Sequence, residues 1–85
     1  MTVKRFKTRP CEIEAVQWTG ANIKEIQEFT RYRALFSTRE DKLILSIPTL
    51  EGVMEARITD YIVKGLKGEF YPCRLDCFKK KYEEI

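Results

Sequence analysis

The chain has few of the side chains that carry out catalysis or bind metals. Its 85 residues include no histidine, which removes the commonest general base and the commonest metal ligand. The cysteines are Cys11, Cys73 and Cys77. A structural zinc site usually takes four ligands in closely spaced pairs, whereas here only Cys73 and Cys77 are close in sequence, and they are separated by three residues. We therefore expect no metal and no cofactor, with Cys11 and Cys77 packed as small apolar residues.

Other arrangements that could support catalysis are equally weak. Cys73 follows a Tyr-Pro pair, but no side chain that could serve as its base is visible. Glu12 and Glu14 lie on one face of a predicted strand, roughly 7 Å apart. That spacing occurs in glycosidases, but a solvated strand face gives it as well. Gly65 and Gly68 do not have the spacing of a phosphate-binding loop. We predict that the protein is not an enzyme.

Aromatic residues are numerous for so small a domain. Because neighbouring residues on a strand face opposite sides, Phe70 and Tyr71 cannot both enter one core. One of them is expected to be exposed or to meet a partner. Packing or self-association, a protein partner, and stacking of a nucleotide or nucleic acid are all open interpretations. The candidate partner-binding residues are Trp18, Tyr61, Phe70 and Tyr71.

The positive charge is concentrated at the N-terminus. Lys4, Arg5, Lys7 and Arg9 give residues 1–10 a charge of +4, while the other 12 basic and 13 acidic residues sum to −1. We predict a basic N-terminal arm over residues 1–9, and these four residues are the candidate anion contacts. Short basic ends are more often simply solvated, so nucleic-acid binding through the arm is the weaker hypothesis.

Length and composition predict a single domain over residues 1–85. A chain of this size holds one modest core, and self-association would add burial, so we expect a homo-oligomer. No apolar run approaches the roughly 18–20 residues of a membrane span, and the basic N-terminus lacks the apolar stretch of a signal peptide. An odd number of cysteines in a chain without an export signal favours reduced thiols and the cytoplasm.

Alternation of apolar and polar residues predicts several strands. Residues 11–18 begin with such alternation, but Val16 and Trp18 then fall on the opposite face. Either both faces are covered there or a bulge shifts the register. A second strand covers residues 43–47 and is expected to end at Pro48. A turn at residues 50–52 precedes a third alternating segment, residues 53–58.

Helical spacing is restricted to two short segments. Ile23, Ile26 and Phe29 form an apolar stripe, and Asn22 with Glu25 resembles a capping box. Residues 75–82 predict a short C-terminal helix, although residues 82–85 could instead form an edge strand. Between the first helix and the strand at 43–47, residues 31–42 are expected to be a connecting loop whose Leu-Phe pair enters the core.

The segment from residue 61 to residue 73 is the best-specified hairpin. Two strand-like runs flank Gly65 and Gly68, which bracket a tip at Leu66 and Lys67, and Pro72 is expected to end the second strand. The predicted fold class is therefore α+β. It is a small antiparallel β-hairpin sheet with one short amphipathic helix packed on it and a short C-terminal helix or strand.

Four segments together resemble a group of small proteins of tailed bacteriophages and prophages. They are EAVQWTG at residues 14–20, IPTLEG at 47–52, DYIVKG at 60–65 and GEFYPC at 68–73, followed by Phe78 and the Tyr-Glu pair at 82–83. Thr59 departs from the group's pattern, which has glycine before the Asp-Tyr pair, and this puts a tight turn there in question. Leu75 stands where proline is common. The resemblance implies a phage or prophage origin and action in the cytoplasm of the bacterial host, but no particular activity.

Three hypotheses follow for function. The leading one is a non-enzymatic accessory protein that binds a host macromolecule, with a host protein as the expected partner. A second is a small-molecule binder that sequesters a nucleotide signal. The third is weak nucleic-acid binding through the basic arm.

Overall fold

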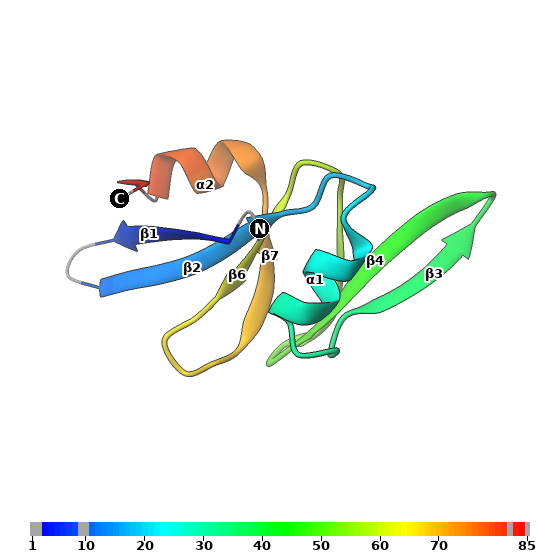
Figure 1. Cartoon of the computed structure of the whole chain (residues 1–85), viewed down its shortest axis with the longest axis horizontal. Coiled ribbons are helices and arrows are strands. Elements are labelled where there is room, and N and C mark those ends of the chain that lie inside the picture. Colours follow the sequence, from blue (N-terminus) through cyan, green and yellow to red (C-terminus); the bar gives the residue numbers. More distant parts are fainter. Residues whose placement is uncertain (1–2, 9–10, 82, 85) are drawn as a thin grey trace.

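The computed structural model of the chain describes residues 3–8, 11–81 and 83–84 (Figure 1). Along the chain the elements are β1 (Lys4–Thr8), β2 (Cys11–Gln17), α1 (Ile23–Phe29), β3 (Leu35–Arg39), β4 (Lys42–Thr49), β5 (Gly52–Ala56), β6 (Tyr61–Lys64), β7 (Phe70–Cys73), α2 (Leu75–Lys81) and β8 (Glu83–Glu84). All paired strands are antiparallel, in one sheet of order β7-β6-β2-β1-β8 and another of order β3-β4-β5. The α+β class is confirmed.

The central strand β2 is covered on both faces. Ala15 and Val16 are adjacent and both fully buried, and Trp18 is 1% exposed. Pairing with β6 runs without interruption from Glu14 to Gln17, so no bulge shifts the register there. Of the two explanations for the change of apolar face, coverage of both faces is the correct one.

Two groups of buried side chains lie on the opposite faces of this sheet. The larger core comprises Val16, Trp18, Ile26, Ala34, Leu45, Ile47, Ala56, Ile62 and Phe70, and so joins the first sheet to α1 and to the second sheet. The smaller core comprises Ile13, Ala15, Val63 and Phe78, and so joins the first sheet to α2. In the smaller core the Tyr61 and Phe78 rings stack at 4.0 Å between centroids and 9° between planes.

Strand β3 corrects the prediction of a loop over residues 31–42. Arg39 pairs with Lys42 across a tip formed by Glu40 and Asp41, whose φ angles are 53° and 64°. A two-residue hairpin of this kind normally carries Asn-Gly or Asp-Gly, so the usual signal of the turn is missing. The Leu-Phe pair divides: Phe36 packs against the Trp18 ring at 5.7 Å, whereas Leu35 is 52% exposed.

Proline ends neither of the strands in which it was expected to do so. Pro72 lies within β7 opposite Ile62, and β7 is an edge strand, so no neighbour on its outer side needs the missing N–H. Pro48 lies within β4 opposite Val53. On its other side β4 pairs with β3 only as far as Ser46. No strand therefore lies opposite Pro48 on that side to need the missing N–H.

The start of α1 differs from the predicted capping box. Asn22 is the N-cap, but its side chain bonds no first-turn N–H group. The Asn22 Nδ2 group donates instead to the Gln17 carbonyl and to Glu25 Oε1, each at 2.8 Å. Asn22 Oδ1 accepts from the backbone N–H and the hydroxyl of Thr19. Asn22 therefore ties the helix to the end of β2.

Both ends of the chain join the larger sheet. The predicted basic arm contains β1, which pairs with β2 and places Arg5 opposite Glu14 and Lys7 opposite Glu12. All of residues 4–8 pair with β2, so they are a sheet strand and not a separate arm. At the other end the chain forms the helix α2 and then the short strand β8, which pairs with β1.

Candidate binding site

The four candidate aromatic residues do not form one surface. Trp18 and Phe70 are buried, at 1% and 3% exposure, and belong to the larger core. Tyr61 is half-buried and stacks on Phe78. Tyr71 is also half-buried. Burial keeps the Trp18 and Phe70 side chains in the core, and of the Phe70–Tyr71 pair it is Tyr71 that reaches solvent.

The candidate basic residues lie at the N-terminal strand. Strand β1 contains Lys4, Arg5 and Lys7, and Arg9 lies outside the described residues. Their role as anion contacts therefore stays a prediction.

Thiols and carboxylates are dispersed over the described residues. Cys73 is half-buried and its Sγ lies 3.8 Å from the Arg74 carbonyl, while Cys77 is exposed. Glu14 is exposed, with the Lys64 ammonium 4.0 Å from its carboxylate. No three metal-binding side chains come together within the part of the chain that the structure describes.

A hollow of about 270 Å³ lies beside the edge strand β7. The turn between β4 and β5 forms its other wall, because β4 and β5 cross close to β7. We call it the β7-edge hollow. Its lining residues are Thr49, Leu50, Glu51, Met54, Glu69, Phe70, Tyr71 and Pro72.

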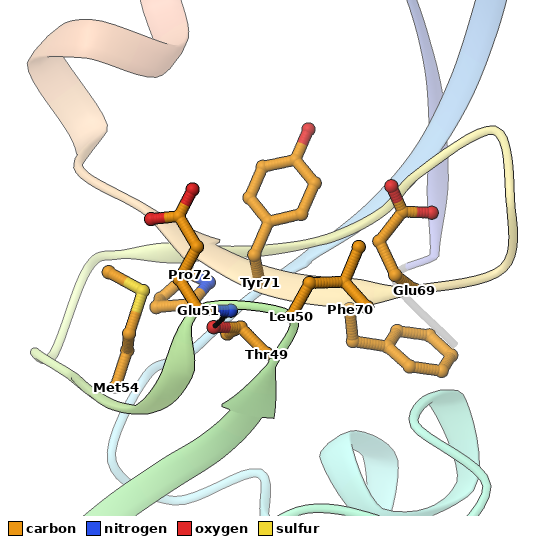
Figure 2. Close-up of a pocket in the computed structure, with 8 residues that line it drawn as sticks. All are labelled: Thr49, Leu50, Glu51, Met54, Glu69, Phe70, Tyr71 and Pro72. Carbon is orange, nitrogen blue, oxygen red and sulfur yellow. Dashed lines mark hydrogen bonds between the residues drawn. The ribbon is translucent and has the colours of Figure 1, made fainter.

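The β7-edge hollow is apolar at its centre and acidic at its rim. Leu50 is 83% exposed and Met54 is 44% exposed. Figure 2 shows the Tyr71 ring and the carboxylates of Glu51 and Glu69 on one side of β7, with the Phe70 ring directed the other way into the protein. Exposed apolar side chains beside a tyrosine and ringed by charge are typical of a protein interface.

Local hydrogen bonds hold both walls of the hollow. In the β4–β5 turn the Thr49 hydroxyl donates to the Gly52 carbonyl at 2.6 Å and accepts from the Glu51 N–H at 3.1 Å. In the other wall Glu69 Oε1 accepts from the Lys67 N–H at 3.0 Å. A Cβ atom at Gly65 would lie 2.5 Å from the Glu69 carboxyl carbon, so glycine leaves room for that carboxylate.

Sequence reasoning missed most of this hollow. Two candidate residues, Phe70 and Tyr71, line it, but sequence patterns place Leu50, Glu51 and Met54 only in a turn and an alternating strand. A leucine at the centre of a tight turn, where polar residues are usual, was the available signal.

Comparisons with protein-family models, with curated proteins and with solved structures find no match to this chain. Among the described residues, no helix combines the length and the apolar character needed to cross a membrane.

Proposed function

We propose that this chain is a non-enzymatic binding protein that holds a protein partner in the β7-edge hollow. The exposure of Leu50 and Met54 carries the proposal. These two apolar side chains lie beside the half-buried Tyr71 and Pro72. A partner that covers them removes apolar surface from water, which favours binding.

Charge indicates the chemistry of the partner. Glu51 and Glu69 flank the apolar centre, and cations are therefore favoured at the rim. The partner that fits is a protein surface with a projecting apolar side chain flanked by lysine or arginine.

The resemblance to phage and prophage proteins supports a host macromolecule as that partner, met in the bacterial cytoplasm. Self-association through β3 is compatible with this function, because β3 lies on the opposite side of β4 from β5, which carries Met54 of the hollow.

Site-specific photocrosslinking tests the proposal. A photoreactive residue is placed at Leu50 in the hollow or at Leu66, which is 71% exposed at the tip of the β6–β7 hairpin. After irradiation in host lysate, we expect a discrete adduct with a host protein from position 50 and not from position 66.

A charge-reversal pair makes the test specific. Glu51→Lys should reduce the adduct several-fold, because it places a cation against the partner's basic residues. Glu40→Lys makes the same charge change at the β3–β4 tip and should leave the adduct unchanged. Equal adducts from positions 50 and 66, or equal effects of the two charge reversals, would overturn the proposal.

A further inference from the structure

A second hollow, of about 380 Å³, lies between the β5–β6 turn and the start of α2. Three basic side chains line it: Arg57 from the turn, Arg74 immediately before α2, and Lys79 from the first turns of the helix. We call it the cationic hollow. None of its residues lines the β7-edge hollow.

The three cations are not used to hold the fold together. All three residues are exposed. Within the described part of the chain, none of their charged groups makes an ion pair or a hydrogen bond. Two other arginines do have partners: Arg39 meets Glu55, and Arg33 lies over the Phe70 ring. Three unpaired cations around one hollow repel one another, and an anion would relieve that repulsion.

Two carboxylates also line the hollow, and backbone groups engage both. Asp60 is buried, and its Oδ2 accepts from the Arg57 N–H at 2.9 Å. Asp76 Oδ1 accepts from the Cys77 N–H at 2.9 Å. With both ionised the hollow keeps a formal charge of 3 − 2 = +1.

The turn that carries Arg57 is held rigidly. The Asp60 N–H donates to the Arg57 carbonyl at 2.9 Å, which closes the turn. The Thr59 N–H donates to the Trp18 carbonyl, and the Trp18 N–H to the Asp60 carbonyl, each at 2.8 Å. Because Trp18 is a core residue, the backbone at Arg57 is placed before any ligand arrives, and this lowers the ordering cost of binding.

The rest of the lining suits a ligand with an apolar part. Ile58 is 60% exposed and Leu75 is half-buried, and both border the hollow. Arginine binds the oxygens of a phosphate in a bidentate manner, and lysine adds a point charge. A phosphate group with an organic substituent matches both the cations and the apolar wall.

We propose that the cationic hollow binds a phosphorylated small molecule of the nucleotide class, with its phosphates on Arg57, Arg74 and Lys79. The organic part of the ligand lies against Ile58 and Leu75. This site is separate from the one proposed for a protein partner.

Isothermal titration of the full chain with inorganic phosphate, AMP and ATP tests this proposal. We expect saturable binding that weakens by about tenfold or more in Arg57→Gln/Lys79→Gln, since hydrogen bonds to charged groups are lost. Arg31→Gln/Lys80→Gln removes two exposed charges outside the hollow. It should change the affinity by no more than about twofold.

The three probes separate the possible sources of affinity. Tighter binding of AMP than of inorganic phosphate supports contact between the nucleoside and the apolar wall, and equal binding assigns the site to the phosphate alone. No saturable binding of any probe, or equal weakening in the two double variants, would overturn the proposal. Leu50→Ser should leave phosphate binding unchanged, so failure here and failure of the protein-partner site are distinguishable.

Discussion

Several turns of this protein use left-handed backbone at residues other than glycine. In the described chain these residues are Arg31, Tyr32, Glu40, Asp41 and Thr59. At the end of α1, for example, the Tyr32 N–H donates to the Gln27 carbonyl at 2.7 Å, and the Arg31 N–H to the Glu28 carbonyl at 3.2 Å. That pattern normally places glycine at the position of Arg31. Hydrogen bonds and packing around these turns therefore impose conformations that the residues themselves disfavour.

Thr59 is the clearest of these residues, because a β-branched side chain at φ 84° is unusual. We predict that Thr59→Gly stabilises the protein by about 1 kcal/mol: relief of roughly 1–3 kcal/mol of strain exceeds the entropic cost of glycine. Urea unfolding measures the change. Thr38→Gly, at an exposed strand position with ordinary φ, should destabilise by a similar amount. A Thr59→Gly variant as unstable as Thr38→Gly would show that the turn is unstrained.

The Arg39–Glu55 ion pair, with 2.6 Å between nitrogen and oxygen, predicts a pH dependence. The hydrogen bond between Arg39 and Glu55 lowers the pKa of Glu55 below the ordinary value of 4.5 and raises the pKa of Arg39 above its ordinary value. A lowered carboxyl pKa stabilises the fold above pH 4.5, and this contribution is lost as the pH falls through the folded-state pKa. The raised pKa of Arg39 adds no pH dependence between acid and neutral pH, because the arginine is protonated throughout that range.

Comparison of wild type with Glu55→Gln tests this pair. The wild type should be slightly more stable at pH 7, and the difference should disappear in acid and shrink in high salt, because the pair is exposed. Glu51→Gln is the control, since within the described chain Glu51 forms no ion pair. A difference that persists unchanged in acid would contradict the assignment.

At the scale of elements, one ring holds α2 on the sheet. Phe78 is 2% exposed, belongs to the smaller core and stacks on Tyr61. We predict a loss of about 3–5 kcal/mol for Phe78→Ala and about 1–2 kcal/mol for Phe78→Leu, which keeps an apolar side chain there but loses the stacking. Urea midpoints measure both. Lys80→Ala on the exposed face of the same helix should be nearly neutral, and equal effects at the two positions would contradict this packing.

For the molecule as a whole, the outer edge of β3 pairs with no other strand in the described structure. Figure 1 shows the β3–β4 hairpin projecting at one end of the longest axis, and β4 is the only sheet neighbour of β3 in the described structure. Arg39 and Lys42 flank the two-residue tip, which makes them a hydrogen-bonded pair of the ladder. Hydrogen-bonded and non-hydrogen-bonded pairs alternate along an antiparallel ladder, so the N–H and C=O groups of Phe36 and Thr38 point away from β4. Two copies of such an edge can pair with each other.

We therefore predict self-association through β3. Thr38→Pro removes an outward N–H without breaking the hairpin ladder, so it should abolish concentration-dependent association in sedimentation experiments while stability is kept. Thr38→Ala retains the N–H and should associate like the wild type. A wild-type chain that stays monomeric at every concentration, or a Thr38→Pro variant that associates normally, would disprove this interface.

Much of the fold follows from local sequence patterns. Alternation locates β2 and β5, an apolar run locates β4, and helical spacing locates α1 and α2. The segments on either side of Gly65 and Gly68 pair as β6 and β7. The β3 strand was missed because its turn, Glu40-Asp41, has none of the residues that normally favour φ above zero. The strand β1 was not predicted because the four basic residues of residues 1–10, three of them in β1, resemble a solvated arm.

The sequence by itself determined the α+β class and the absence of histidine, because residue type and periodicity can be read along the chain. Only the tertiary structure decided that Trp18 and Phe70 are core residues while Tyr71 borders a hollow. Only the tertiary structure places Leu50 and Tyr71 at one hollow and Arg57 and Arg74 at another. Both pairs come from segments far apart in sequence, and their proximity depends on how two sheets and a helix cross, which no local pattern encodes.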